Sequence, residues 1–369
     1  MSARQIIYDL FSGAGITVNG DQPYDIQVHN EKFYPLLMGN AQLGLGESYM
    51  DSWWECNYLD EFINKILRAN LNEKVSKNLK VLLQIIKSII FNLQNKALSK
   101  KLGVRHYNLG NDLFQAMLDK RLTYSCGYWK NAKNLEEAQE AKLDLICQKL
   151  NLKPGMKLLD IGCGWGSLAS YAAEKYGVHV TGYNISDEQV YFARERCKNL
   201  PVNIRLEDYR DAKGQYDAVV SVGFMEHVGH KNYRKYMEVT HQCLKDDGIA
   251  LLHTISNNIT TNYFNPWTDK YIFHNGMIPS VARITKSFEG LFMLEDIENI
   301  GPHYDPTLMA WYNNFHKSWP HLQEKYGKRF YRMWRFYLLS SAGGFRSRYN
   351  QVMQYVLTKK GRNQPDCRI

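Results

Sequence analysis

The sequence predicts an α/β fold in which helices cover both faces of a mostly parallel β-sheet. From Leu152 onward, short apolar strand-like segments alternate with helical patterns, and this alternation is typical of a doubly wound sheet. A glycine-rich turn follows the first of these strands and opens a helix. The chain has 369 residues, which suits two domains, so we expect a small N-terminal domain beside the α/β domain.

The individual elements of the sheet follow the hydrophobic pattern along the chain. The predicted strands are 157–161, 178–183, 202–206, 216–222 and 249–255, and the predicted helices between them are 167–176 and 188–198. Residues 292–300 and 349–358 are expected to complete a seven-stranded sheet as an edge hairpin. An aromatic-rich helical stretch at about 306–345 separates these two strands, and we expect it to form a helical lid.

The first part of the chain is organised differently. Residues 1–73 are expected to form the small N-terminal domain, in which Gly44 and Gly46 are interpreted as turn glycines before an aromatic-rich run. Residues 74–105 contain lysines and an arginine but no carboxylate, while Leu and Ile recur at helical spacing. This basic amphipathic helix is expected either to pack on a neighbouring domain or to act as a linker or bilayer contact. Residues 106–369 then form the α/β domain.

Composition and net charge indicate which cellular compartment and which kinds of binding partner to expect. The net charge of +9 favours an anionic partner, such as nucleic acid, acidic lipid or a phosphate-bearing ligand. The seven cysteines are dispersed without a C-x-x-C pair, which predicts neither a zinc ribbon nor a disulfide framework and favours a reducing cytoplasm. No signal-peptide pattern and no run of ~18 apolar residues is present, so we expect any membrane contact to occur at the surface.

The strongest local motif runs from Asp160 through Gly162, Gly164, Trp165 and Gly166. The glycines allow the backbone to approach a ligand that a Cβ would repel, and the helix that follows offers free N–H groups. The spacing G-x-G-x-G differs from the dinucleotide fingerprint G-x-G-x-x-G. It resembles the first motif of class I methyltransferases, which implies a Rossmann-like methyltransferase fold that binds S-adenosylmethionine.

Polar residues after the next two strands are candidates for the rest of the cofactor site. The residues after the second strand, where the ribose hydroxyls would reach, are Asn184, Ile185, Ser186 and Gln189. Many methyltransferases carry an acid there, so uncharged polar groups must serve in this chain. Asp208 and Tyr209 follow the third strand, where an acid can accept the adenine amino group and a ring can stack. A solvated loop acid is the alternative interpretation of Asp208.

Two residues at the ends of the fourth and fifth strands are candidates for chemistry. Glu226 follows the fourth strand, and His253 lies within the fifth. Ligands of open α/β sheets bind outside the carboxyl ends of the strands, so both side chains can face one crevice beside the glycine loop. Taken alone, Glu226 can equally be a helix cap and His253 a satisfied buried ring.

Longer segments carry a more specific resemblance. These segments are HYNLGNDLF (106–114), YSCGYW (124–129), VGFMEHVG (222–229), LHTI (252–255) and DPTLMAWY (305–312). They resemble the cyclopropane fatty acid synthases, and residues 44–55 resemble the bacterial branch with an extra N-terminal domain. The resemblance implies transfer of a methylene unit from S-adenosylmethionine to the cis double bond of unsaturated phospholipid acyl chains. It also implies a homodimer in the cytoplasm, bound peripherally at the inner membrane surface.

The resemblance further implies a mechanism and its residues. In this family the alkene attacks the sulfonium methyl, and a bound bicarbonate takes one proton from that carbon as the ring closes. Tyr124 and Ser125 match family cofactor contacts. By motif, the bicarbonate cage is Cys126, Glu226, His253, Tyr304 and the backbone of Ile255. Cysteine, tyrosine and histidine can donate hydrogen bonds to the anion, and the glutamate would accept from its hydroxyl. No metal site is expected.

One position departs from the family pattern. The family motif C-A-G-x-F-R reads Ser341 to Arg346 in this chain, and a serine hydroxyl is a far poorer base than a thiolate. The bicarbonate mechanism does not depend on that thiol. Two alternatives stay open: a fatty-acyl or small-molecule methyltransferase without ring closure, and a non-catalytic relative that binds the cofactor. Nucleic acid is not expected as a partner, because the sequence contains no D/N-P-P-Y/W motif.

Overall fold

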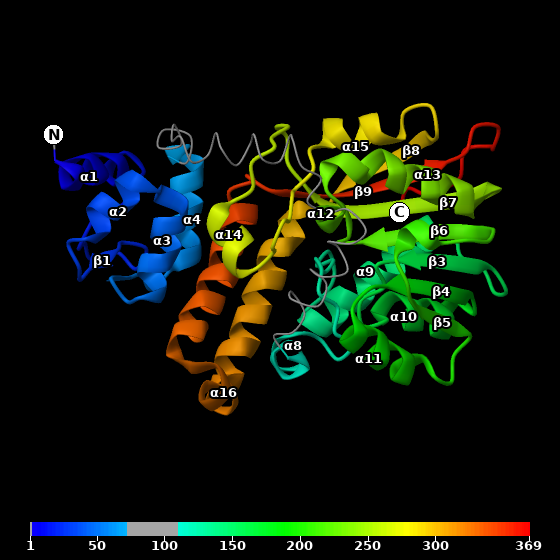
Figure 1. The fold of residues 1–369 in the computed structure, drawn as a ribbon, viewed down its shortest axis with the longest axis horizontal. Helices are drawn as coiled ribbons and strands as arrows, with labels where there is room; N and C mark the ends of the chain where they lie inside the picture. Colours follow the sequence, from blue (N-terminus) through cyan, green and yellow to red (C-terminus); the bar gives the residue numbers. More distant parts are fainter. Residues whose placement is uncertain (1, 72–109) are drawn as a thin grey trace. The chain divides into compact units, whose positions relative to one another are not determined.

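The computed structural model describes residues 2–71 and 110–369, which belong to two compact units (Figure 1). We call the first the N-terminal unit; it joins the start of the chain to Asn262–His274 and Tyr304–Asn350. We call the second the sheet unit; it contains residues 110–261, Asn275–His303 and Gln351–Ile369. The predicted basic helix at 74–105 and both of its boundaries lie outside the described residues, so these domain boundaries stay predictions.

Within its described residues the sheet unit contains one seven-stranded sheet, in the order β5-β4-β3-β6-β7-β9-β8. The strands are β3 (Lys157–Ile161), β4 (His179–Asn184), β5 (Val202–Leu206), β6 (Tyr216–Val222), β7 (Leu244–Ser256), β8 (Met293–Asn299) and β9 (Gln351–Thr358). Strands β3 to β7 pair in parallel, and β9 is antiparallel to both of its neighbours. The predicted sheet and the antiparallel pairing of its last two strands are therefore confirmed.

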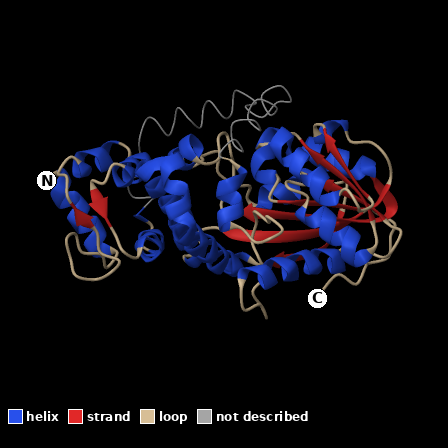
Figure 2. Ribbon diagram, turned by 90° about the horizontal axis from the view of Figure 1, so that it is seen from below, coloured by secondary structure: helices blue, strands red, loops and turns tan. Residues whose placement is uncertain are grey.

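Helices cover both faces of this sheet, as Figures 1 and 2 show. One face carries α9 (Leu135–Lys149), α10 (Ser167–Tyr176) and α11 (Asp187–Cys197); the other carries α12 (Met225–Val228), α13 (Tyr233–Cys243) and α15 (Val281–Phe288). Because side chains alternate along a strand, Leu158 packs in the first layer and Leu159 in the second. The short helix α8 (Asn111–Met117) and the 3-10 turns η1 (Tyr209–Asp211), η2 (His230–Asn232) and η3 (Gly301–His303) connect these elements.

The N-terminal unit is mainly helical. Its elements are α1 (Ala3–Gly13), β1 (Gln27–Val28), α2 (Phe33–Gly39), α3 (Ala41–Met50), β2 (Trp54–Glu55), α4 (Leu59–Arg68), α14 (Pro266–Tyr271) and α16 (Tyr304–Arg346). The long helical stretch predicted at 306–345 is confirmed as α16. Gly327 has a φ of 75° and interrupts the helical geometry, so α16 consists of two helices joined at this residue.

The interpretation of Gly44 and Gly46 as turn glycines is wrong, because both lie inside helix α3. A Cβ on Gly46 would stand 2.3 Å from the Trp267 ring of α14, and a Cβ on Gly44 would stand 3.0 Å from the Leu36 side chain of α2. These glycines therefore allow helices to approach closely. Sequence alone does not distinguish such a contact from a turn, because both need a missing Cβ.

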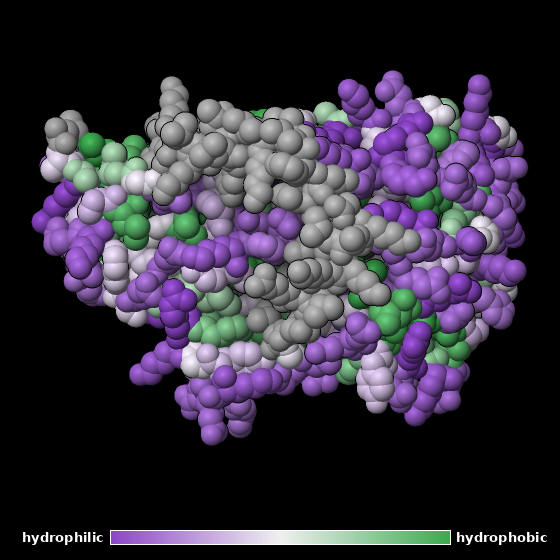
Figure 3. Space-filling view, viewed as in Figure 1, coloured by the Kyte–Doolittle hydropathy of each residue, from purple (hydrophilic) through white to green (hydrophobic). Residues whose placement is uncertain are grey.

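Hydrophilic side chains dominate the described part of the face shown in Figure 3. Among the described helices, none is both long and apolar enough to cross a membrane.

Candidate functional site

The glycine loop between β3 and α10 lies at the carboxyl end of strand β3, inside the sheet. Gly162, Gly164 and Gly166 have φ values of 80°, 54° and 76°, in the left-handed region that favours glycine. A Cβ on Gly162 would stand 2.4 Å from the Phe224 ring, so this glycine is needed for packing. A Cβ on Gly164 would meet nothing within 4 Å. The backbone at Gly164 therefore borders open space, which suits the close approach of a ligand.

Asp160, at the end of β3, is a buried carboxyl with an unused oxygen. The residue is 2% exposed, and its Oδ2 has no hydrogen-bond partner among the described residues. Burial raises the pKa of Asp160 to about 7, although the nearby charge of Lys142 acts in the opposite direction. Buried polar atoms are almost always hydrogen-bonded, so this oxygen is a candidate acceptor for a ligand N–H.

The residues after β4 brace the glycine loop. The Asn184 side-chain nitrogen donates to the Gly164 carbonyl at 3.2 Å and to Gln189 Oε1 at 2.8 Å, and its oxygen accepts from the Ile185 and Ser186 N–H groups. Ser186 caps the N-terminus of α11. The fold thus brings these four predicted residues next to the loop, and their contact with the ribose stays a prediction.

The residues after β5 have partners within the protein. Asp208 accepts from the Arg210 side chain at 2.9 Å and from its backbone N–H at 2.9 Å. The Tyr209 ring is 5% exposed and packs against Phe224 and Tyr236, with ring centroids 5.4 and 5.6 Å apart. Tyr209 therefore belongs to the core on the face of the sheet that α12, α13 and α15 cover. The adenine contacts predicted for both residues stay predictions.

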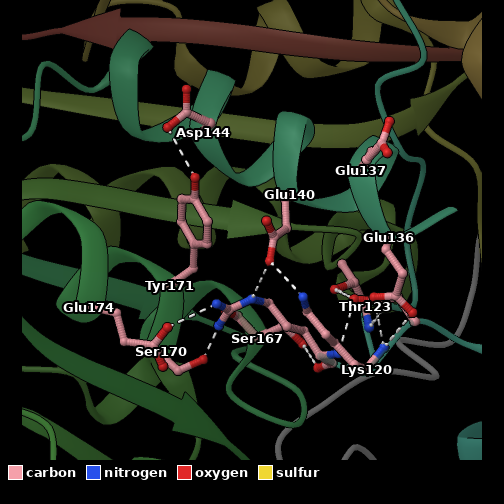
Figure 4. Close-up of polar contacts among 12 residues, drawn as sticks. Lys120, Thr123, Glu136, Glu137, Glu140, Asp144, Ser167, Ser170, Tyr171 and Glu174 are labelled. Carbon is pink, nitrogen blue, oxygen red and sulfur yellow. Dashed lines mark hydrogen bonds and ion pairs between the residues drawn. The ribbon is translucent and has the colours of Figure 1, made fainter. Parts of the chain in front are cut away.

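Residues 119–126, which we call the 119–126 segment, are held by polar contacts from α9 and α10 (Figure 4). The Arg121 guanidinium donates to Glu140 of α9 at 3.4 Å and to Glu174 of α10 at 2.9 Å. Ser167 Oγ at the start of α10 donates to the Arg121 carbonyl at 2.7 Å, and Asp119 accepts from the Thr123 N–H at 2.7 Å. These contacts fix the backbone that carries Tyr124, Ser125 and Cys126.

Aromatic packing joins the same segment to the glycine loop. The Tyr124 ring lies 5.2 Å from Phe114 of α8, which lies 4.9 Å from the ring of Trp165. Trp165 Nε1 donates to Asn111 Oδ1 at 3.1 Å, and the residue is 3% exposed. Tyr124 and Trp165 are thus brought into one cluster with α8.

Glu226 links α12 to β7 through its carboxyl. Its Oε1 accepts from the Ile255 backbone N–H at 2.6 Å, while Oε2 is buried with no partner among the described residues. Burial raises the pKa of Glu226 to about 7. The side chain is therefore a mixture of acid and carboxylate near neutral pH, which suits a proton donor or acceptor.

His253 is a buried neutral imidazole that contacts a side chain of the neighbouring strand. Its Nδ1 lies 3.2 Å from the side-chain amide of Gln354 on β9, so this amide occupies that ring nitrogen. Burial lowers the pKa of His253 well below its usual range, so the ring is neutral at pH 7. Sequence reasoning missed Gln354, although a glutamine inside the apolar strand 351–358 was a signal.

The remaining predicted residues are placed less specifically. Cys126 is fully buried, with its Sγ 3.9 Å from the Ile300 carbonyl. Tyr304 begins α16 in the N-terminal unit, where its ring lies 4.5 Å from Phe345, and its role stays a prediction. Two further polar residues that sequence reasoning missed, Gln139 and Lys142 of α9, are completely buried beside the 119–126 segment. The described residues contain no cluster of His, Cys, Asp and Glu that could hold a metal ion.

Sequence comparison finds related proteins along nearly the whole chain. Residues 94–355 match the family described as mycolic acid cyclopropane synthetase. The cyclopropane-fatty-acyl-phospholipid synthase of Escherichia coli K12 is 51% identical over 96% of this chain and 93% of its own length. The tuberculostearic acid methyltransferase UfaA1 of Mycobacterium tuberculosis is 32% identical over 86% of this chain and 79% of its own.

Solved structures agree with the sequence matches. The mycolic acid cyclopropane synthase CmaA1, complexed with SAH and CTAB, superposes with a TM-score of 0.67 at 31% identity, over 70% of this chain and 98% of that protein. Coclaurine N-methyltransferase, bound to N-methylheliamine and SAH, superposes with a TM-score of 0.71 at 20% identity, over 86% of this chain and all of that protein. The second likeness shows the fold alone.

Proposed function

The chain belongs to the mycolic acid cyclopropane synthetase family, and we propose that it forms cyclopropane rings on unsaturated phospholipid acyl chains with S-adenosylmethionine as methylene donor. It is an S-adenosylmethionine-dependent transferase. The observation that carries the proposal is that Glu226, just after β6, and the neutral His253, near the end of the adjacent strand β7, lie at the same edge of the sheet as the glycine loop. Ring closure requires the loss of a proton from the transferred carbon, whereas N-methylation does not.

The residues around the glycine loop fit S-adenosylmethionine. When bound, this cofactor supplies an electrophilic methyl group on a sulfonium. The free oxygen of Asp160 would accept from its amino group, and the open space at Gly164 would admit its methionine portion. Tyr124, Ser125 and the residues after β4 and β5 would complete the site. Cation–π contact with aromatic side chains favours a sulfonium as it does other cations.

We also propose that bicarbonate binds beside the cofactor and supplies the base that removes the proton. The residues that would hold it are Cys126, Glu226, His253, Tyr304 and the Ile255 backbone. His253 would present Nε2 to the anion, because the Gln354 amide occupies Nδ1. Glu226 would accept from the bicarbonate hydroxyl. The Ile255 N–H already donates to Glu226, so the anion would share or displace that hydrogen bond.

Lipid analysis tests the reaction. Expression in a bacterium that lacks cyclopropane fatty acids should convert part of its unsaturated acyl chains to species that gain one CH₂ and lose the alkene. Purified protein with vesicles and S-adenosylmethionine should give the same products. A methyl-branched chain that retains an alkene would refute ring closure and support the alternative of methylation alone.

A second assay tests bicarbonate separately. Turnover should fall when the buffer is purged of CO₂ and should return when bicarbonate is added. The added bicarbonate should have little effect on E226Q, because the proposed acceptor is missing. Unchanged turnover in CO₂-free buffer would refute the bicarbonate role while leaving ring formation intact.

We propose a peripheral contact with the inner membrane surface through the basic segment 74–105, which lies outside the described residues. Replacing Lys77, Lys80 and Lys87 by Gln should weaken binding to anionic vesicles by up to ~3 kcal/mol at low salt, since each charge contributes about 1 kcal/mol. Co-sedimentation with anionic and neutral vesicles measures this, and unchanged binding would place the contact elsewhere. The proposed homodimer is tested by sedimentation equilibrium.

A further inference from the structure

Two completely buried polar side chains of α9 hold the 119–126 segment from inside the protein. Gln139 and Lys142 are three residues apart and therefore lie on one face of the helix. The Gln139 side-chain nitrogen donates to the carbonyls of Ser125 and Thr123, at 2.8 and 3.3 Å. The Lys142 ammonium donates to Ser125 Oγ at 2.7 Å. Both contacts converge on Ser125, one on its backbone and one on its side chain.

Lys142 has an unusual environment for a lysine. Its side chain is fully buried, and its Nζ donates to a hydroxyl; among the described residues no carboxylate lies within ion-pair distance of it. A buried ammonium without a paired carboxylate is costly, so packing alone does not account for a lysine here. Lys149, two turns later on the same helix, shows the contrast, because its buried ammonium is paired with Glu298 of β8.

We propose that Lys142 is a positioning residue for the cofactor: its ammonium holds the Ser125 hydroxyl in place, and its positive charge favours the ionised form of the buried Asp160 carboxyl. This inference rests on the proposed binding of S-adenosylmethionine. The backbone of Ser125 is already fixed by Gln139, so the lysine has the separate task of orienting the hydroxyl. Its charge also acts on the Asp160 carboxyl at the end of β3.

The charged groups around Lys142 and Asp160 determine how cofactor affinity should depend on pH. Lys142 interacts with the charges of Asp119, Cys126 and Asp160, and its own charge also acts on His253. The groups that interact with Asp160 besides Lys142 are Cys147, Cys163, Cys197 and Tyr236. Lys142 is the group that lowers the pKa of Asp160, against the rise caused by burial. Removing the lysine should therefore leave Asp160 protonated at neutral pH and unable to accept from an ammonium group.

The test uses K142M, which replaces the ammonium by an apolar chain of similar length. We expect its melting temperature to be unchanged or higher, because a buried unpaired charge is removed. Its affinity for S-adenosylhomocysteine, measured by calorimetry at pH 7, should fall at least 10-fold. The affinity should recover partly toward pH 9, where Asp160 ionises. A purely structural role would instead lower the melting temperature and leave the pH dependence unmoved.

Matched variants separate the two tasks. K149M removes a paired buried lysine of the same helix, so it should lose stability but keep its affinity and its pH dependence. Ser125→Ala should weaken binding without moving the pH dependence, since the charge is retained. If K142M does not fold, K142Q carries the same test, because it also removes the charge. Parent-like affinity and pH dependence in the Lys142 variant, or the same losses in K149M, would overturn the proposal. If the wild-type protein does not bind S-adenosylhomocysteine, the result refutes the proposed function itself and not only the role of Lys142.

Discussion

Replacing Glu226 by Gln should separate the stability of the site from its chemistry. Burial raises the pKa of Glu226 from 4.5 to about 7, so the folded protein disfavours the charged form. The wild type is therefore penalised increasingly as the pH rises from 4.5 to about 7, and the penalty levels off above pH 7; below 4.5 the group is protonated in both the folded and unfolded states. The penalty is about 3 kcal/mol above pH 8 and about 1 kcal/mol at pH 5.

Glutamine keeps an oxygen that can accept from the Ile255 N–H but carries no charge. E226Q should thus be more stable than the wild type at pH 8.5, by up to ~3 kcal/mol, and by about 1 kcal/mol at pH 5. Urea denaturation at the two pH values measures this difference. Turnover on lipid vesicles should fall about 10²-fold or more, because a positioned acid–base group is lost.

The exposed Glu289 provides the matched control, since E289Q should change neither the pH dependence of stability nor turnover. Two results would refute the reasoning about Glu226. One is an E226Q variant whose stability relative to wild type is the same at both pH values. The other is turnover close to that of the parent.

Three further predictions concern other positions. Gly164→Val should lower the affinity for S-adenosylhomocysteine more than 10-fold. Gly155→Val, at a position that also has a positive φ and open space at its Cβ, should lower stability only; if calorimetry gives the Gly164 variant the same affinity as the wild type, the loop is not part of the site. Gly46→Val should destabilise the protein by about 1–3 kcal/mol because its side chain would collide with a tryptophan of α14, while Gly13→Val, with open space, should not; similar melting temperatures would contradict this. Ser341→Ala should retain substantial ring-forming activity, and a folded but inactive variant would indicate a direct role for this hydroxyl.

The sequence predicted the strands of the sheet best where burial leaves a short apolar run. Strands β3 and β6 are largely buried and have the predicted bounds. The edge strand β5 also has its predicted bounds, although it is mostly exposed and alternates apolar with polar residues. Strand β7 begins at Leu244, five residues before the predicted start at Ile249. The intervening residues are mostly polar, and they belong to the strand because Leu244 pairs with Tyr216 across an irregularity in the register. Hydrophobic pattern does not report such pairing.

By itself the sequence determined the sheet, the glycine loop and the position of Asp160 and Glu226 at strand ends. These features are local, since a few neighbouring residues decide where a strand stops and where a positive φ is needed. Only the tertiary structure decided that Gln354 hydrogen-bonds His253 over a separation of 101 residues, that Lys142 lies buried against Ser125, and that Glu226 accepts from the Ile255 N–H. It also decided the protonation of His253, Lys142 and Glu226. A pKa depends on burial and on the charges that packing brings together, and sequence spacing specifies neither.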